Sequence, residues 1–243
     1  MPGGTLSTAF HLTHACNLRC TYCYTGEKLA RRMEPDTADR GVDFALAEAR
    51  RQGAEHLEVV FFGGEPLLEP ELLCRIADRA TDRADGLRVS FKTSTNGVLL
   101  TEPVLRALAR RRVFVSISLD GDPATQDRQR PDAAGRGSAA RLGEAIDRLL
   151  AWNPCANVTC VITPDGAGRA DAAVDWLFER GFRFLSTTLD YGARWTRDDL
   201  DRLAGAYRRM ADAYVARTLA GEKLYVSALD ERIRTWTRGP LDS

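Results

Sequence analysis

Features that would place this chain in a membrane or an export pathway are missing from the sequence. It has no apolar run of about 18 residues, the length that a membrane-spanning helix needs. The first ten residues lack a charged segment followed by an apolar core, so we expect no secretory signal. The chain has 34 basic and 34 acidic residues, so its formal net charge is zero. Its overall charge therefore does not favour binding to nucleic acid or to an anionic membrane. We therefore expect a cytoplasmic protein with neither a nucleic-acid nor a membrane partner.

Cysteine is also scarce, since six residues in 243 are too few for a disulfide scaffold. Three of the six are nevertheless gathered near the start, in Cys16-Asn-Leu-Arg-Cys20-Thr-Tyr-Cys23. A closed structural metal site uses four protein ligands, whereas three ligands leave one position open for chemistry. A loop with three thiolates can hold three irons of a [4Fe-4S] cluster and leave the fourth iron to a non-protein ligand. The spacing therefore predicts a reactive iron–sulfur centre.

Other roles for these three cysteines explain less of the pattern. A zinc ribbon would need a second cysteine or histidine pair at ligand spacing, which the sequence does not offer. A thioredoxin-like dithiol accounts for Cys20 and Cys23 but leaves Cys16 without a role. Disulfide pairing is disfavoured because such clusters in cytosolic sequences more often bind metal or do redox chemistry. The three remaining cysteines are expected at small buried positions: Cys74, Cys155 and Cys160.

Strand-like and helix-like segments alternate along the chain. Short runs rich in β-branched and aromatic residues are separated by stretches with a 3.6-residue apolar period. The six runs predicted to be strands are residues 9–13, 56–62, 87–94, 113–119, 157–163 and 182–189. This alternation indicates βαβ units and a parallel sheet. Because six units fall short of the eight in a closed barrel, we predict an α/β fold with a partial (β/α)6 TIM-type barrel, and chemistry at the C-terminal ends of its strands.

The pattern changes after residue 195. Apolar residues spaced three and four apart predict one amphipathic helix over 197–219, whereas 223–236 is ambiguous. We therefore divide the chain into a core domain of residues 1–195 and a C-terminal helical segment of residues 196–243. Within the core, Thr101 and Ser138 are expected to cap helices. Residues 121–137 are rich in Gly, Pro, Asp and Arg, and predict a long loop over the active face.

Polar motifs follow three of the predicted strands. After the second strand comes Gly63-Gly64-Glu65, where glycines let the backbone approach a ligand and a carboxylate would suit an ammonium group. A plain turn before a helix would explain the same glycines. Residues 94–97, Ser-Thr-Asn-Gly, follow the third strand and are also compatible with a simple turn. The fourth strand ends with polar residues on one face, where they need a partner or a ligand: Ser116, Ser118 and Asp120.

Taken together, these motifs resemble those of the radical S-adenosylmethionine (SAM) superfamily. The matching elements occur in the expected order: Cys16-x3-Cys20-x-Tyr22-Cys23, Gly63-Gly64-Glu65-Pro66, the Thr-Asn-Gly turn at 95–97, and Ser118-Leu-Asp-Gly121. They cover residues 10 to 189. The pairing of Phe-Gly-Gly-Glu-Pro-Leu with Ser-Leu-Asp-Gly is more similar to the SPASM-type branch, which includes anaerobic sulfatase-maturating enzymes and maturases of ribosomally made peptides.

The resemblance implies a role for each matched residue. Cys16, Cys20 and Cys23 would ligate three irons of a [4Fe-4S] cluster, and SAM would chelate the fourth iron through its amino and carboxylate groups. Arg130 ends a segment similar to the branch's His-Asp-x-x-Arg, with Gln126 where His is usual. The implied SAM contacts are Tyr22 near the adenine, Gly63, Gly64 and Glu65 at the methionine ammonium, Ser118 at the ribose with Asn96 in support, and Arg130 at the carboxylate.

The implied activity is reductive cleavage of SAM to a 5′-deoxyadenosyl radical, which abstracts hydrogen from a peptide or protein side chain. The implied partners are that peptide or protein and an external flavodoxin- or ferredoxin-like electron donor. Two alternatives stay open. A glycyl-radical-enzyme activase would have a similar compact size. A non-catalytic iron–sulfur electron carrier would explain the cysteines but neither Gly63-Gly64-Glu65 nor Ser118-Leu-Asp-Gly121.

Auxiliary clusters are not expected within this chain. The SPASM-type branch holds such clusters with cysteines in a C-terminal extension, and no cysteine follows Cys160. Residues 196–243 then represent either the start of a truncated SPASM/twitch-type extension or the end of a reduced enzyme with the SAM cluster alone. With fifteen residues before Cys16, no leader-peptide-binding domain is expected in front. Neither the substrate nor a general base can be named from the sequence.

Overall fold

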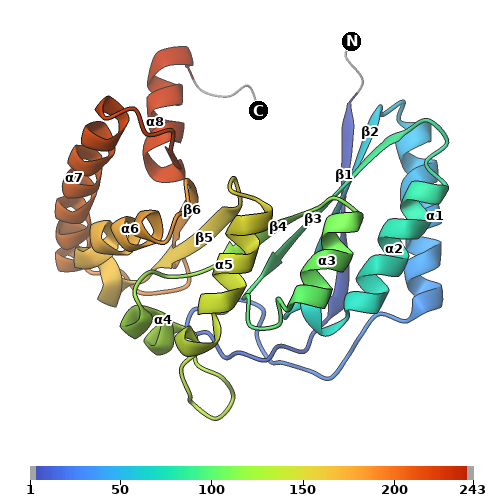
Figure 1. The fold of residues 1–243 in the computed structure, drawn as a ribbon, viewed down its shortest axis with the longest axis horizontal. Coiled ribbons are helices and arrows are strands. Elements are labelled where there is room, and N and C mark those ends of the chain that lie inside the picture. Colours follow the sequence, from blue (N-terminus) through green and yellow to red (C-terminus); the bar gives the residue numbers. More distant parts are fainter. Residues whose placement is uncertain (1–3, 240–243) are drawn as a thin grey trace. The chain divides into compact units, whose positions relative to one another are not determined.

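The computed structural model describes residues 4–239, and its strands and helices alternate along the chain (Figure 1). The strands follow one another in sequence order across one sheet. They are β1 (Thr5–Thr13), β2 (His56–Gly63), β3 (Arg88–Thr95), β4 (Val113–Ser118), β5 (Asn157–Ile162), β6 (Phe184–Leu189) and β7 (Tyr225–Val226). Pairing is parallel between β1 and β2, β2 and β3, β5 and β6, and β6 and β7. The predicted α/β class with parallel strands is confirmed.

Helices connect these strands. The α-helices are α1 (Pro35–Arg51), α2 (Pro70–Asp82), α3 (Glu102–Arg110), α4 (Pro123–Gln129), α5 (Gly143–Trp152), α6 (Ala170–Glu179), α7 (Arg197–Leu219) and α8 (Ser227–Arg238). Three short 3₁₀ segments are η1 (Pro66–Leu68), η2 (Ala139–Arg141) and η3 (Pro164–Arg169). No helix between residues 4 and 239 combines the length and the apolar content that crossing a membrane would require.

The chain divides into two compact units, with the division inside β4. The N-terminal unit contains the residues up to Leu18 together with Thr25–Ser116. The C-terminal unit contains Arg19–Tyr24 together with the residues from Ile117 onward. Cys16 thus belongs to the N-terminal unit, whereas Cys20 and Cys23 belong to the C-terminal unit. The predicted boundary between residues 195 and 196 stays a prediction.

The core of the N-terminal unit forms because the apolar residues of each strand and helix recur with the period of that element and so lie on one face. In β2, alternate residues are buried, including Leu57, Val59 and Phe61, as expected for side chains that point to opposite faces. Helix α1 buries one face through residues spaced three and four apart, among them Val42 and Leu46. Ion pairs join α1 to its neighbour α2: Arg75 with Asp39 and Arg79 with Asp43.

Helix α7 in the C-terminal unit confirms the amphipathic helix predicted over 197–219. Its start is fixed by a capping box, in which the Thr196 hydroxyl accepts the Asp199 N–H at 3.2 Å and the Asp199 carboxylate accepts the Thr196 N–H at 2.8 Å. Its buried face includes Leu203, Ala206 and Met210. The ambiguous stretch after it contains the short strand β7 and the helix α8.

The long loop predicted over 121–137 is wrong in part, because α4 lies within it. Asp122 caps this helix by accepting the N–H groups of Ala124 and Thr125 at 3.0 and 3.1 Å, and Pro123 occupies its first turn. A helix of seven residues is too short to display an apolar period. The glycine and proline residues around this helix therefore led to the prediction of a loop.

The two predicted helix caps are wrong as side-chain caps. Thr101 does occupy the N-cap position of α3, but its hydroxyl makes no capping hydrogen bond. Ser138 occupies the N-cap position of η2, and its hydroxyl makes no capping hydrogen bond either. Its buried hydroxyl instead accepts a hydrogen bond from Nε2 of Gln126 at 3.2 Å. Ser138 therefore ties the segment after α4 back to that helix.

Candidate functional site

The N-terminal unit holds Cys16 in a short turn directly after β1. The Thr13 hydroxyl accepts the N–H of Ala15 at 3.1 Å, which turns the chain at the end of the strand. The Leu18 N–H then points back at the Cys16 sulfur, with 3.4 Å between nitrogen and Sγ. Asn96, which follows β3, places its Nδ2 at 3.9 Å from the same sulfur. The Cys16 sulfur thus faces two N–H donors, and it also lies 3.9 Å from Oδ1 of Asn17.

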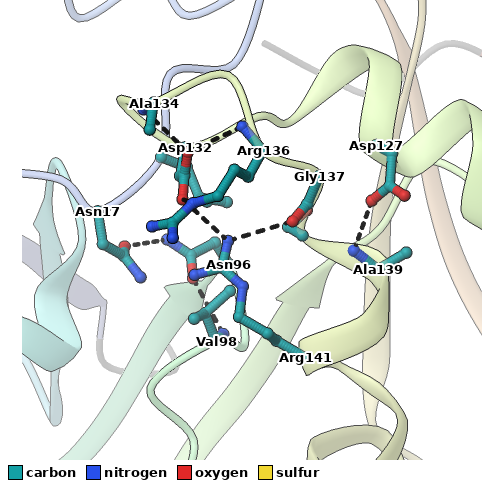
Figure 2. A network of polar contacts seen from close by, with 12 residues as sticks. Asn17, Asn96, Val98, Asp127, Asp132, Ala134, Arg136, Gly137, Ala139 and Arg141 are labelled. Carbon is teal, nitrogen blue, oxygen red and sulfur yellow. Dashed lines mark hydrogen bonds and ion pairs between the residues drawn. The ribbon is translucent and has the colours of Figure 1, made fainter.

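A pair of amide side chains lies beside this turn (Figure 2). Asn96 accepts the Val98 N–H through Oδ1 at 3.0 Å, so its Nδ2 must be the donor. That Nδ2 donates to Oδ1 of Asn17 at 2.7 Å. The remaining polar atom of Asn17, Nδ2, is buried and has no hydrogen-bond partner among residues 4–239. Asn17 therefore presents an unused donor next to Cys16.

The glycine pair after β2 packs against the backbone that leads to Cys16. The Gly64 N–H donates to the Thr13 carbonyl at 2.8 Å, and the Glu65 N–H donates to the Ala15 carbonyl at 2.9 Å. A Cβ atom at Gly63 would lie 2.5 Å from the Thr13 oxygen, and one at Gly64 would lie 2.2 Å from the Ala15 oxygen. Glycine is therefore required at both positions for this close approach.

The Glu65 carboxylate is buried and held by uncharged donors. One oxygen, Oε1, accepts the Leu67 N–H at 3.0 Å and the Thr95 hydroxyl at 2.7 Å. The other, Oε2, accepts the Asn96 N–H at 2.8 Å. Only 1% of the residue is exposed. The structure thus brings three predicted site residues of the N-terminal unit, Glu65, Asn96 and Cys16, into one hydrogen-bonded group.

The segment that carries Cys20 and Cys23 is anchored within the C-terminal unit by its backbone. The Arg19 N–H donates to the Pro131 carbonyl at 2.6 Å, and the Thr21 N–H donates to the Gln129 carbonyl at 2.9 Å. A tight turn joins the two cysteines, because the Cys23 N–H donates to the Cys20 carbonyl at 3.1 Å. The C-terminal end of α4 therefore serves as the support for this segment.

A buried ion pair lies beneath the same segment. Arg130 donates through Nε and Nη2 to the two oxygens of Asp120 at 2.8 and 2.9 Å. The Tyr22 hydroxyl donates to Asp120 at 2.7 Å, and the Arg130 guanidinium lies 5.3 Å from the centroid of the Tyr22 ring. The Val161 N–H and the Asp120 N–H complete the network, the latter by donating to Oε1 of Gln126 at 3.0 Å. We call Asp120, Arg130 and Tyr22 the buried triad.

Burial and charge act together on the buried triad. Burial raises the pKa of the Tyr22 hydroxyl, the Arg130 charge opposes the rise, and Asp120 reinforces it. Burial alone would lower the pKa of Arg130, but the charge of Asp120 and its hydrogen bonds to the guanidinium outweigh burial, so this pKa is raised. Tyr22 therefore stays a neutral donor and Arg130 stays a cation. Nε and Nη2 of Arg130 already donate hydrogen bonds to Asp120. The predicted contact of Arg130 with a SAM carboxylate stays a prediction.

The remaining predicted site residue, Ser118, is the last residue of β4 and is half-buried. Its proposed ribose contact stays a prediction. The sequence marks Asp120 as a polar residue on one face of the fourth strand and as part of the Ser118-Leu-Asp-Gly121 motif, but its partners do not follow from either observation. Asn17 was missed altogether. Its position between two motif residues, Cys16 and Cys20, was the one signal that could have drawn attention to it.

The other three cysteines are partly as expected. Cys160 is buried, and burial raises the pKa of its thiol, as suits an inert core position. Cys74 is half-buried. The prediction of a buried Cys155 is wrong, because this residue is exposed in the turn between α5 and β5. Its N–H donates to Oδ1 of Asn153 at 3.0 Å.

Three cysteine side chains are the donor type that binds a [4Fe-4S] cluster. Among residues 4–239, no group of three histidine, cysteine, aspartate or glutamate side chains converges on one ion. In a [4Fe-4S] cluster each thiolate binds a different iron, so three thiolates need not converge in that way. All six cysteines are outside disulfides. The unused Asn17 donor, the glycine backbone and the buried Glu65 carboxylate add polar groups of the kind that a charged cofactor requires.

Comparison with known proteins decides the family. The model of the radical SAM superfamily matches residues 10–206. The chain belongs to this superfamily. Its members use a [4Fe-4S] cluster and SAM, so the family, the cofactors and the branch suggested by the motifs are confirmed.

Two relatives of this radical SAM chain carry names from the predicted branch. The serine-type anaerobic sulfatase-maturating enzyme of Klebsiella aerogenes is 31% identical over 175 residues, which are 70% of this chain and 43% of that protein. The cysteine-type anaerobic sulfatase-maturating enzyme of Clostridium perfringens (strain 13 / Type A) is 24% identical over 175 residues, 70% of this chain and 47% of that protein. The chain therefore spans less than half the length of these relatives.

Solved structures with low identity share the fold. The structure of anSMEcpe with bound AdoMet and Cp18Cys peptide has a TM-score of 0.84 at 21% identity, and covers 100% of this chain and 68% of that one. Streptococcus suis SuiB bound to precursor peptide SuiA has a TM-score of 0.65 at 17% identity, and covers 92% of this chain and 48% of that one. These likenesses establish the arrangement of strands and helices.

Proposed function

We propose that this chain is a radical SAM enzyme that removes a hydrogen atom from a side chain of a peptide or protein. The observation that carries the proposal is the set of three thiolates at Cys16, Cys20 and Cys23 inside the matched region. Three protein ligands leave one iron for SAM. When bound, the reduced cluster and SAM supply one-electron chemistry that is strong enough to break an unactivated C–H bond.

The protein's own residues would hold and orient these cofactors. Cys16, Cys20 and Cys23 would bind one iron each. Glu65 would accept the methionine ammonium of SAM, since its buried carboxylate is held in place by hydrogen bonds to both oxygens. The backbone of Gly63 and Gly64 would complete that subsite. The other proposed SAM contacts are Tyr22 at the adenine, Ser118 at the ribose, Asn96 in support, and Arg130 at the carboxylate.

The proposed substrate class rests on the relatives and on the fold neighbours. Two relatives are named as sulfatase-maturating enzymes, and two fold neighbours are described with bound peptides. A peptide or protein side chain is therefore the proposed site of hydrogen abstraction. An external electron donor of the flavodoxin or ferredoxin type would reduce the cluster. We further propose that the protein works in the cytoplasm, where a reducing environment preserves the thiols.

The test is SAM cleavage by the anaerobically reconstituted protein with dithionite as reductant. We expect release of 5′-deoxyadenosine, detected by liquid chromatography, and loss of that release in Cys20→Ala. The matched control is Cys155→Ala, because Cys155 is exposed and lies outside the motif; this variant should cleave SAM as the wild type does. An intact wild-type cluster without any SAM cleavage would support an electron carrier instead and would sink the enzyme proposal.

The substrate class needs a separate assay. Short peptides with a central cysteine or a central serine would be incubated with the active protein and analysed by mass spectrometry. We expect a modified side chain and faster release of 5′-deoxyadenosine when a peptide is accepted. Modification of a glycine in a protein backbone, with no side-chain product, would instead favour a glycyl-radical-enzyme activase.

A further inference from the structure

We propose that Asn17 donates a hydrogen bond through Nδ2 to a sulfur of the cluster that Cys16 binds, and that Asn96 is the positioning residue that holds Asn17 in this orientation. The inference rests on the proposed function, because it needs a cluster at Cys16. It adds a tuning role for Asn17, which has no part in the proposed function, and a positioning role for Asn96 beside its proposed support of SAM binding.

The orientation of Asn17 follows from a chain of fixed hydrogen bonds. The Val98 N–H can only donate, so it fixes Oδ1 of Asn96 as the acceptor at 3.0 Å. Nδ2 of Asn96 must then be the donor to Asn17, at 2.7 Å. Asn17 therefore accepts through Oδ1, and its Nδ2 is the group left over. No rotation of the two amides by 180° satisfies the same contacts.

The position of Asn96 is itself well determined. Its N–H donates to Oε2 of the buried Glu65 at 2.8 Å. Its side chain is anchored by the Val98 N–H, and 7% of the residue is exposed. Hydrogen bonds thus fix both the backbone and the side chain of Asn96. Its own hydrogen bond to Asn17 fixes the orientation of that amide in turn. Figure 2 shows the two amides joined in this way, with the dashed line from Asn96 ending on Oδ1 of Asn17 and none at its Nδ2.

The unused donor calls for an acceptor because it is buried. A buried amide N–H₂ without a hydrogen-bond partner destabilises the fold, and Nδ2 of Asn17 is such a group among residues 4–239. Asn17 adjoins Cys16 in sequence, and the two side chains already lie 3.9 Å apart at Sγ and Oδ1. Cluster sulfurs are acceptors that carry negative charge. They are the acceptors that iron binding at Cys16 would bring to this place.

A donor at a cluster sulfur has a measurable consequence. Hydrogen bonds to the sulfurs help set the reduction potential of an iron–sulfur cluster. The reduced cluster has one more negative charge than the oxidised cluster, so a donor stabilises the reduced form more. Removing the Asn17 donor should therefore lower the potential. The Leu18 N–H at 3.4 Å from Sγ of Cys16 would remain in place, so the effect is a shift and not a loss of the redox couple.

The experiment is an EPR-monitored redox titration of the reconstituted protein without SAM. Two variants remove the donor: Asn17→Leu, which has a similar size, and Asn17→Asp, which keeps the acceptor for Asn96. We expect both variants to reduce less readily, with a reduction equilibrium constant about tenfold smaller. For one electron this corresponds to a midpoint potential about 59 mV lower. Asn96→Ala should shift the potential in the same direction by less. Wild-type potentials in Asn17→Leu and Asn17→Asp, at wild-type iron content, would overturn the proposal.

The matched control is Asn153→Asp in the turn before β5. Oδ1 of Asn153 accepts the Cys155 N–H at 3.0 Å, and an aspartate keeps that acceptor. This variant should have the wild-type potential. A shift as large as that of Asn17→Asp would show that any new carboxylate changes the potential, and would remove the support from that variant.

A second measurement decides the matter if the Asn17 variants do not retain iron. The wild-type protein is grown with ¹⁵N-asparagine, and the reduced cluster is examined by pulsed EPR. We expect a weak coupling to an asparagine nitrogen and to an exchangeable proton; absence of both would contradict the proposal. Failure of the proposed function can be told apart from failure of this inference. A cluster that shows these couplings but never cleaves SAM would refute the enzymatic function and leave the Asn17 role in place. SAM cleavage by a cluster with neither coupling nor shift would refute the Asn17 role alone.

Discussion

The two buried carboxylates near the cysteines, Glu65 in the N-terminal unit and Asp120 in the C-terminal unit, are satisfied in different ways. Glu65 accepts hydrogen bonds from two backbone N–H groups and a hydroxyl, all uncharged. Asp120 is matched by the guanidinium of Arg130 in a two-pronged pair. The donors that contact Glu65 orient its carboxylate, whereas the guanidinium of Arg130 also neutralises the charge of Asp120. The first arrangement suits a group that receives a cation, and the second suits a structural anchor.

The largest effect is expected from breaking the structural anchor. In Arg130→Leu the Asp120 charge stays buried without its cation, and loss of one partner from a buried pair costs about 3–5 kcal/mol. The free energy of unfolding, measured by urea denaturation and circular dichroism, should fall by that amount. Arg106→Leu is the control, because its pair with Glu102 is exposed; it should stay within about 0.5 kcal/mol of wild type. Equal effects in the two variants would show that the buried triad is not an anchor.

The glycine pair next to Glu65 provides the second test. In Gly64→Ala the new Cβ would lie 2.2 Å from the Ala15 carbonyl oxygen, so the backbone must move. Overpacking of this kind costs about 1–3 kcal/mol. Gly143→Ala is the matched control, because a Cβ there meets nothing within 4 Å at the start of α5. A Gly64→Ala protein as stable as Gly143→Ala would contradict the close approach of the two backbones.

The Glu65 carboxylate should contribute more to the affinity for SAM than the Asp120 carboxylate does. Glu65→Gln keeps the size but removes the charge, and it places an amide N–H₂ against groups that already donate. We expect a loss of about 1–3 kcal/mol in the free energy of unfolding. We also expect SAM to bind about tenfold or more weakly, by loss of a charge-assisted hydrogen bond. Equilibrium dialysis with the reconstituted protein measures the second quantity. Unchanged SAM affinity would exclude Glu65 as the ammonium acceptor.

The smallest effect is expected at the Tyr22 hydroxyl. Tyr22→Phe removes one donor of Asp120 but leaves Arg130 and the Val161 N–H, so the free energy of unfolding should fall by about 1–2 kcal/mol at pH 8. Because the folded-state pKa of Tyr22 is raised, the hydroxyl's stabilisation is complete below its unfolded value of 10.0 and is lost as the pH rises above it. The difference between wild type and Tyr22→Phe should therefore shrink between pH 9 and 11. A difference that grows over this range would contradict the raised pKa.

Local periodicity was enough to predict most of the fold. Helix α7 was predicted over its observed range because its apolar spacing continues over many turns. The six longer strands were predicted because their apolar runs lie between turn residues. The strand β7 was not, since two residues carry no pattern. Helix α4 was hidden by the glycine and proline around it.

The candidate site could be predicted only where a motif carries its own chemistry. The spacing of Cys16, Cys20 and Cys23 indicates a cluster without any knowledge of the fold. The pairing of Asp120 with Arg130 could not be derived, because it depends on how α4 folds back on the end of β4. Asn17 escaped notice for a similar reason, since its unused donor exists only because Asn96, far along the chain, occupies its Oδ1.

The central claim is that Cys16, Cys20 and Cys23 hold a [4Fe-4S] cluster whose fourth iron takes SAM. Its most direct test is the EPR spectrum of the anaerobically reduced protein before and after addition of SAM, with iron counted on the same sample. We predict about four iron atoms per chain and a spectrum that changes when SAM is added. A count near eight or twelve would show that further cysteines bind clusters. A four-iron cluster whose spectrum is identical with and without SAM would contradict the claim.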